Sequence, residues 1–247
     1  MTGRTAVIAD LHANLEALTA VIEQITAMDI DRIVCLGDVV GYNANPNECV
    51  DLLRNQKAIC VAGNHDIAVA EGGNIDFFTN AARQAVVWTR RAITEETRRF
   101  LLALPREIQV GPLFLFHGSV HDTDRYIITR KDAVDNFLML AGLGSRVRVG
   151  LFGHTHQAAA LVGEAGTVAD VSSPAILDLL PENRYLINPG SVGQPRDGDP
   201  RAAFAILDQN AQRATFHRVA YDIRRCRDKI LRAGLPTALA DRLLIGR

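Results

Sequence analysis

Residues 5–12 read TAVIADLH, a short apolar run that ends on an aspartate and a histidine. Two later stretches repeat this plan, RIVCLGD at residues 32–38 and AICVAGNHD at residues 58–66. Short apolar runs rich in valine and isoleucine and bounded by glycine or polar residues are typical of buried strands. The three stretches therefore predict three strands, each of which leads directly into a polar segment.

Helical patterns separate these strands. Residues 14–28 place leucine and isoleucine side chains at helical spacing, and residues 46–54 begin with Pro46, which suits the first turn of a helix. Strands that alternate with helices favour a largely parallel sheet with helical crossovers. The first quarter of the chain thus predicts a βαβαβ unit.

The remainder of the chain changes character towards its end. Residues 80–104 form a helical region, and strands are expected at 113–116 and 147–152 with a helix at 131–141 between them. The last third has strand-like runs at 158–162, 184–187, 202–207 and 213–219, then helical patterns at 222–232 and 237–244. Turns rather than long helices join these strands, which predicts a second, more antiparallel sheet. We expect a single domain spanning residues 1–247, with two stacked sheets.

The composition sets the class of protein. The chain has 247 residues, 48% of them hydrophobic and 22% charged, and a net charge of −1, so no basic footprint for nucleic acid stands out. No apolar run reaches eighteen residues and no signal-peptide pattern precedes the first strand, so we expect no membrane association. Four cysteines without any CxxC pair favour reduced core residues in a cytoplasmic protein. The oligomeric state is left open.

Five polar segments follow predicted strands. They are DLH at residues 10–12, GD at 37–38, GNHD at 63–66, HG at 117–118 and GHTH at 153–156. Ligands of open α/β sheets bind beyond the carboxyl ends of the strands, so these segments are expected to converge. Residues i and i+2 of an extended backbone point the same way, so Asp10 and His12 are expected to face one point, and so are His154 and His156. Carboxylate, imidazole and amide groups together suit divalent metal ions.

Each segment alone also has a purely structural explanation. A D-x-H triplet is commonly a surface aspartate beside an incidental histidine, and G-D is commonly a turn. A single histidine such as His117 is commonly a hydrogen-bonded, partly buried side chain. The full set is harder to explain in this way, because the five segments hold five of the seven histidines. We therefore interpret the set as one metal site.

This ordered set of segments resembles the signature of the calcineurin-like metallophosphoesterases, from Asp10 to at least Ser191. Within that superfamily the chain is similar to the small bacterial and archaeal phosphodiesterase-like group, through GDVVGY at residues 37–42 and NPGSVGQPR at residues 188–196. The resemblance implies an α/β fold of the α+β sandwich kind. Two stacked mixed β-sheets flanked by helices would form a four-layer architecture.

The resemblance also implies a role for each polar residue. Asp10, His12 and His156 would hold one metal ion, Asn64, His117 and His154 a second ion, and Asp38 would bridge the two. His65 would contact the phosphate, and Asp66 would orient His65 through a hydrogen bond. The two divalent ions would be Mn, Fe, Zn, Co or Ni.

One departure from better-known relatives affects the substrate. The protein Ser/Thr phosphatases and dinucleoside tetraphosphatases carry an acidic residue and an Arg-Gly pair after G-D-x-V, where this chain has GYN at residues 41–43. Arg196 could replace that arginine or could equally be a surface residue in a turn. Loops such as 77–91 and 119–130 are expected to supply the walls of the substrate pocket, and Tyr42, Arg125 and Tyr126 are further candidates to line it.

The implied activity is hydrolysis of a small phosphate ester, a phosphodiester or a phosphomonoester, by a water or hydroxide that bridges the two metal ions. A nucleotide or dinucleoside polyphosphate hydrolase is the alternative enzyme. A non-catalytic scaffold with the same fold is a third possibility, but such a scaffold should have lost ligands, whereas this chain keeps all seven and His65. Because the chain lacks the arginine of that Arg-Gly pair, we expect it to cleave diesters at least as well as monoesters, since a diester carries less charge and needs less cationic support.

Overall fold

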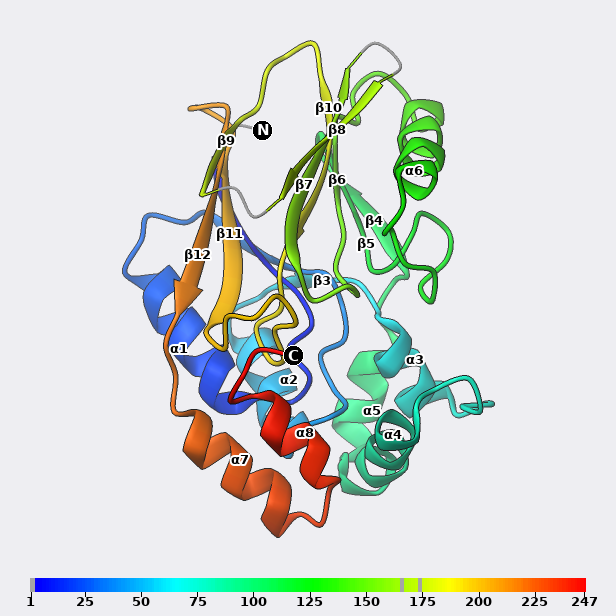
Figure 1. The fold of residues 1–247 in the computed structure, drawn as a ribbon, viewed down its shortest axis with the longest axis vertical. Coiled ribbons are helices and arrows are strands. Elements are labelled where there is room, and N and C mark those ends of the chain that lie inside the picture. Colours follow the sequence, from blue (N-terminus) through cyan, green and yellow to red (C-terminus); the bar gives the residue numbers. More distant parts are fainter. Residues whose placement is uncertain (1–2, 165–166, 173–174) are drawn as a thin grey trace.

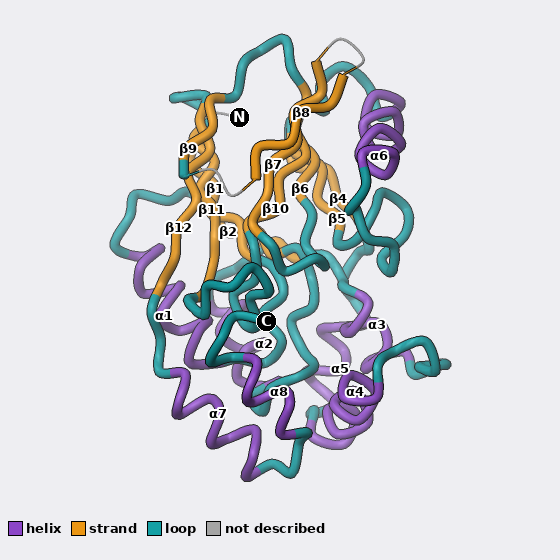
Figure 2. Tube along the Cα trace, viewed as in Figure 1, coloured by secondary structure: helices purple, strands orange, loops and turns teal. Residues whose placement is uncertain are grey.

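Two six-stranded β-sheets packed face to face form the centre of the molecule, and helices cover their outer faces (Figure 1). The computed structural model describes residues 3–164, 167–172 and 175–247. The layers run from helices through both sheets to a further helix, as Figure 2 shows by colour. The predicted two-sheet α/β architecture is therefore confirmed.

The first sheet contains the three strands predicted from the opening stretches. Its order is β3-β2-β1-β11-β12-β9. Strands β1 (Arg4–Ile8), β2 (Arg32–Cys35) and β3 (Ile59–Cys60) are parallel, and β11 (Ala202–Asp208), β12 (Arg213–Val219) and β9 (Ile176–Asp178) add to them in antiparallel fashion.

The second sheet has the order β4-β5-β6-β10-β7-β8. Its strands are β4 (Glu107–Val110), β5 (Leu113–Phe116), β6 (Val149–Leu151), β10 (Arg184–Pro189), β7 (Ala158–Glu164) and β8 (Thr167–Ser172). Strands β5, β6 and β10 are parallel to one another, and the other pairs are antiparallel.

The prediction that the last third forms its own sheet is wrong. Strands β7 and β10 extend the second sheet, whereas β11 and β12 complete the first. Strand β1 would otherwise be an edge with unpaired backbone groups, and β11 satisfies them with the register Val7 to Ala205. The antiparallel character of the region was predicted correctly, but both sheets share it.

The helices are α1 (Leu15–Thr26), α2 (Pro46–Asn55), α3 (Asn64–Glu71), α4 (Asn80–Ala92), α5 (Glu95–Leu102), α6 (Arg130–Gly142), α7 (Ile223–Arg232) and α8 (Thr237–Arg242). Helix α1 lies against β11 and β12 of the first sheet, α7 packs on α1 and α8, and α6 lies over the second sheet (Figure 1). The helical region expected at 80–104 is two helices, because Thr94 caps α5 by accepting the Thr97 N–H at 3.1 Å. None of the helices in the described ranges is long and apolar enough to cross a membrane.

Alternation along the central strands builds the layers. In β1, Ala6 and Ile8 join the core beneath the helices, whereas Val7 joins the core between the two sheets. Both faces are buried, so the strand reads as a continuous apolar run. Strands β1, β2, β3, β5 and β6 are each followed by one of the five polar segments. Their carboxyl ends meet at one edge of the sandwich.

Candidate metal centre

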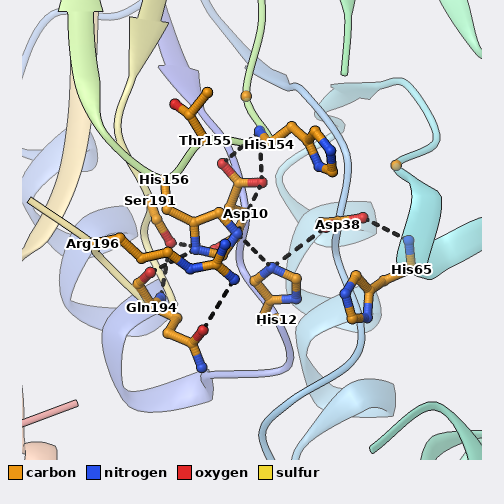
Figure 3. A network of polar contacts seen from close by, with 12 residues as sticks. Asp10, His12, Asp38, His65, His154, Thr155, His156, Ser191, Gln194 and Arg196 are labelled. Carbon is orange, nitrogen blue, oxygen red and sulfur yellow. Dashed lines mark hydrogen bonds and ion pairs between the residues drawn. The ribbon is translucent and has the colours of Figure 1, made fainter. Parts of the chain in front are cut away.

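Two groups of side chains that could hold a metal ion meet at that edge, and Figure 3 shows the first of them. The first group is Asp10, His12, Asp38 and His156, and the second is Asp38, His117 and His154. Within each group the candidate ligand atoms lie within 4.8 Å of one another, and every side chain is buried. The structure thus brings together six of the seven predicted ligands in two adjoining clusters.

Asp38 belongs to both clusters. Its Oδ2 atom lies 3.4 Å from His12 Nε2 and also 3.4 Å from His117 Nε2. Its Oδ1 atom accepts the backbone N–H of His65 at 2.9 Å, which fixes the carboxylate in place. A carboxylate in this position can contact two cations at once.

Backbone carbonyls orient the histidine rings. The Nδ1 atoms lie near carbonyl oxygens as follows: His12 at 3.2 Å from Val40, His117 at 2.8 Å from Leu36 and His156 at 2.6 Å from Gln194. Donation from Nδ1 leaves Nε2 free to bind a metal. In His154 the two ring nitrogens exchange roles. Nε2 lies 3.1 Å from the Asp124 carbonyl, and Nδ1, 3.2 Å from His117 Nε2, is the nitrogen that faces the second group.

Electrostatics favour neutral imidazoles at three of these positions. Burial lowers the pKa of His154 to about 3, and it holds the pKa values of His12 and His156 well below the usual range. Neutral imidazole is the form that binds metal ions. Burial alone would also lower the pKa of His117, but the Asp38 carboxylate outweighs it and raises that pKa to about 9.

The pKa values of the Asp10 and Asp38 carboxylates shift in opposite directions. Burial raises the pKa of Asp10 to about 7, despite its contacts with the His154 N–H at 3.0 and 3.1 Å. Burial would also raise the pKa of Asp38, but the surrounding imidazoles, His117 foremost, hold it well below its usual range. A cation beside Asp10 would favour its charged form.

Asn64 supplies a further indication of a cation. Its Oδ1 atom is buried and has no hydrogen-bond partner among the described residues. A buried amide oxygen without a partner costs free energy, which coordination to a divalent ion would recover. Nitrogen and oxygen donors from carboxylate, imidazole and amide groups fit divalent metal ions.

The backbone around these ligands is not extended, so the i, i+2 argument for Asp10 and His12, and for His154 and His156, is wrong. Five ligands have positive φ angles, namely Asp10 at 53°, His12 at 47°, Asp38 at 52°, His154 at 66° and His156 at 59°. Left-handed conformations are costly for residues with a side chain and persist where surrounding contacts impose them. Here the loops hold one another, since the His12 N–H donates to the Asp38 carbonyl at 2.8 Å.

The NPGSVGQPR segment braces the ligand loops from the other side. Ser191 Oγ and the Gly193 N–H both donate to the Asp10 carbonyl, at 2.8 and 2.9 Å. A Cβ atom on Gly193 would lie 1.8 Å from the Leu11 carbonyl oxygen, so only glycine fits. Asn188 Nδ2 donates to the Gly153 carbonyl at 2.7 Å. The segment therefore ties the loop after β1 to the loop after β6.

Asp66 does not contact the His65 ring, which corrects the predicted orienting role. Its Oδ1 atom accepts the Val40 N–H at 3.0 Å, and its Oδ2 atom accepts the Gly63 N–H at 3.0 Å. Asp66 lies in the first turn of α3, where a carboxylate pairs with free backbone donors. It joins the loop after β2 to the loop after β3.

Asp66→Ala is expected to destabilise the fold by about 2–4 kcal/mol, because two buried N–H groups lose their acceptor. Urea denaturation measures the change. Asp76→Ala is a matched control, since the exposed Asp76 pairs only with Arg83 at 3.6 Å and should cost under about 0.5 kcal/mol. Unchanged stability in Asp66→Ala would contradict the clamp role.

Packing instead of a hydrogen bond positions His65. The His65 ring lies 4.9 Å from the Phe78 ring and 4.5 Å from the Tyr42 ring, centroid to centroid. A Cβ atom on Gly41 would come within 2.6 Å of His65 Nδ1, so glycine at this position makes room for the ring. Burial lowers the pKa of His65 to about 4. Residues 41–42 therefore form the wall behind His65.

A cavity of 380 Å³ opens above the two clusters. Of the four predicted pocket residues it includes Tyr42, Tyr126 and Arg196. Arg196 Nη2 lies 3.3 Å from Tyr42 Oη, and its charge helps to lower the pKa values of the buried histidines. Arg125 is not among the lining residues, because its guanidinium pairs with Asp132 at 2.9 Å and Asp135 at 3.4 Å.

The stretches 77–91 and 119–130, expected to supply pocket walls, do so through Phe77, Phe78, Thr79, Ala82, Asp124 and Tyr126. Sequence reasoning missed Arg242 and Arg247. No motif surrounds these two arginines, and they lie more than a hundred residues from most of the predicted site. Tyr126, which was predicted, stacks on His154 with ring centroids 3.9 Å apart. Aromatic and charged side chains thus surround the mouth of the cavity.

Comparisons with known proteins agree with this geometry. Residues 4–212 match the model of the calcineurin-like phosphoesterase superfamily domain. The chain is 39% identical over 246 residues to the uncharacterized protein MJ0912 of Methanocaldococcus jannaschii, covering 98% of each chain. It is similar to the crystal structure of a metallophosphoesterase from Sphaerobacter thermophilus, with 38% identity, a TM-score of 0.85 and full coverage of both chains. The hypothetical protein PH1004 of Pyrococcus horikoshii shares the fold, with 20% identity, a TM-score of 0.79 and coverage of 99% and 98%.

Proposed function

Because the chain belongs to the calcineurin-like phosphoesterase superfamily, we propose that it hydrolyses a small phosphate ester at a site for two divalent metal ions. The proposed ligands are Asp10, His12 and His156 for one ion and Asn64, His117 and His154 for the other, with Asp38 shared. The observation that carries the proposal is the position of Asp38. Its Oδ2 atom is equally distant, at 3.4 Å, from a histidine of each cluster.

Two such ions would supply positive charge against the phosphoryl oxygens and acidify a water near neutral pH. The protein's own groups complete the site. His65 lines the cavity without belonging to either ligand cluster, so it is placed to donate a proton to the leaving oxygen or a hydrogen bond to the phosphate. Arg196 adds a cation on the side of His12 and His156.

The position of Arg196 bears on the type of ester. The sequence argument for diesters rested on a missing arginine after Asp38, and Arg196 in the cavity offsets that absence. The proposal therefore covers phosphodiesters and phosphomonoesters alike. A non-catalytic scaffold is disfavoured, because all predicted ligands and His65 are retained, and Asp38, Asn64, His65, His154 and His156 line one cavity.

A cytoplasmic location is part of the proposal. It rests on four free cysteines that are all buried, since unpaired thiols are typical of reducing compartments. A small-molecule substrate is likewise proposed, because the cavity measures 380 Å³.

The experiment that tests the proposal is hydrolysis of bis(p-nitrophenyl) phosphate and p-nitrophenyl phosphate by purified protein with Mn, Fe, Co, Ni, Zn or Mg. We expect turnover of at least one substrate, loss of turnover after exhaustive treatment with EDTA, and recovery on return of the metal. Elemental analysis should find two ions per chain. Full turnover after chelation would refute the metal-dependent reaction.

A further inference from the structure

The cavity contains more positive charge than a single phosphate at the metal centre requires. Apart from the predicted metal ligands and His65, its charged lining residues are Asp124, Arg196, Arg242 and Arg247. This part of the cavity lining therefore has three arginines and one carboxylate. Arg196 lies against the ligand histidines and contacts Tyr42 and Gln194 at 3.3 Å each, so it belongs to the metal side of the cavity.

Arg242 and Arg247 come from a segment that is fastened to the site. The Gly246 carbonyl accepts the Gly198 N–H at 2.9 Å, two residues beyond Arg196. A Cβ atom on Gly246, where φ is 63°, would meet the Asp199 backbone at 2.6 Å, so only glycine allows this approach. Leu243 is buried in the core below the helices. Figure 1 shows the end of α8 against the loop that follows β10.

The two guanidinium groups are not used by the fold. Within the described parts of the chain, neither has a hydrogen bond or ion pair to another side chain. Neighbouring arginines differ, since Arg201 pairs with Asp199 at 2.6 Å and Arg227 with Asp241 at 3.3 Å. Cations that line a cavity without a protein counter-ion are available to an anionic ligand.

We propose that the substrate carries a second anionic group, a phosphate or a carboxylate, and that Arg242 and Arg247 bind it while the metal centre and Arg196 hold the phosphate ester. This inference rests on the proposed phosphoesterase function and specifies its substrate class. The segment 237–247 then selects substrates, and a phosphate ester with one charged group uses only part of the cavity.

The test uses three ligands that resist hydrolysis because they contain phosphorus–carbon bonds. Propylphosphonate has one anionic group, propane-1,3-diphosphonate has two phosphonates, and 4-phosphonobutyrate has a phosphonate and a carboxylate. Calorimetry with the manganese-loaded protein measures each Kd, and elemental analysis afterwards checks that the metal stays bound. We expect at least one of the two ligands with two anionic groups to bind about tenfold more tightly than propylphosphonate, the usual worth of one charged hydrogen bond. The better of the two identifies the second group.

The variant Arg242→Gln/Arg247→Gln should reduce this tenfold advantage to about twofold or less. Arg247→Gln alone, at an exposed position, should remove part of it even if the double variant folds poorly. Arg91→Gln is the matched control, an exposed arginine of α4 outside the cavity, and should keep the full advantage. Equal Kd values for all three ligands, or an advantage that survives in both variants, would overturn the inference. Turnover of the p-nitrophenyl esters tests the phosphoesterase function separately, so either idea can fail alone.

Discussion

Asp38→Ala is expected to empty both metal sites and to lower the turnover of phosphate esters by about a thousandfold or more. Asp38 is the one side chain shared by the two clusters, with Oδ2 at 3.4 Å from both His12 and His117. Its removal should also lower the pKa of His117, because the Asp38 carboxylate is the group that raises it. Elemental analysis of the purified variant measures the metal content, and the p-nitrophenyl ester assay measures turnover.

Asn64→Ala is the matched comparison. Asn64 Oδ1 is the unpartnered oxygen proposed for the second site alone, so this variant should keep about one ion per chain. Two ions retained in Asp38→Ala would contradict the bridging position. Equal metal loss in both variants would instead indicate that the two sites depend on each other in some other way.

His65→Ala is expected to retain both metal ions and to lower kcat by about a hundredfold or more, the usual scale for a lost general acid or transition-state hydrogen bond. His65 lies in the cavity, but neither cluster of ligand atoms includes it. Its backbone N–H still donates to Asp38 in the variant, because that contact does not involve the ring. Steady-state kinetics and elemental analysis together separate catalysis from metal binding.

The choice of leaving group distinguishes two roles for His65. If the imidazole protonates the leaving oxygen, the loss should shrink for nitrophenolate and grow for a poorly leaving alkoxide. If it only stabilises charge on the phosphate, the loss should be constant across leaving groups. Near-normal turnover in His65→Ala, or loss of an ion, would refute both roles. Phe78→Leu, which alters the ring packed 4.9 Å from His65, should produce a milder loss with metals retained.

The amino-acid sequence by itself predicted nine of the described strands and the five polar segments, but it did not predict β4, β8 and β9, which lie at sheet edges. The signals for the nine predicted strands are local. They consist of apolar runs such as TAVIA and of the glycines and polar residues that end them, all within a few residues of one another in the chain. The rule that ligands lie at the carboxyl ends of parallel strands then predicted convergence of Asp10, Asp38 and His154, as the structure has them.

The detailed orientation of these groups depended on contacts that no local pattern contains. The left-handed backbone at Asp10 and His12 is held by hydrogen bonds that their N–H groups donate to carbonyls of the loop after β2, not by a preference of the two residues themselves. Asp66 clamps two backbone N–H groups because it lies in the first turn of α3, which begins at Asn64, where no helix was predicted. A helix with a weak amphipathic pattern offers little periodicity from which to predict it.

The walls of the cavity were decided by the tertiary structure alone. Arg196 reaches Tyr42 across 154 residues of sequence, whereas Arg125, which looked equivalent, finds acidic partners within ten residues. The last strands divide between both sheets because β1 requires an antiparallel partner, which places α8 and Arg242 beside the site. Local sequence determines which residues form strands, helices and turns. The free energy of pairing strand edges and of burying the apolar faces of sheets and helices depends on distant segments. That free energy decides which side chains share a cavity.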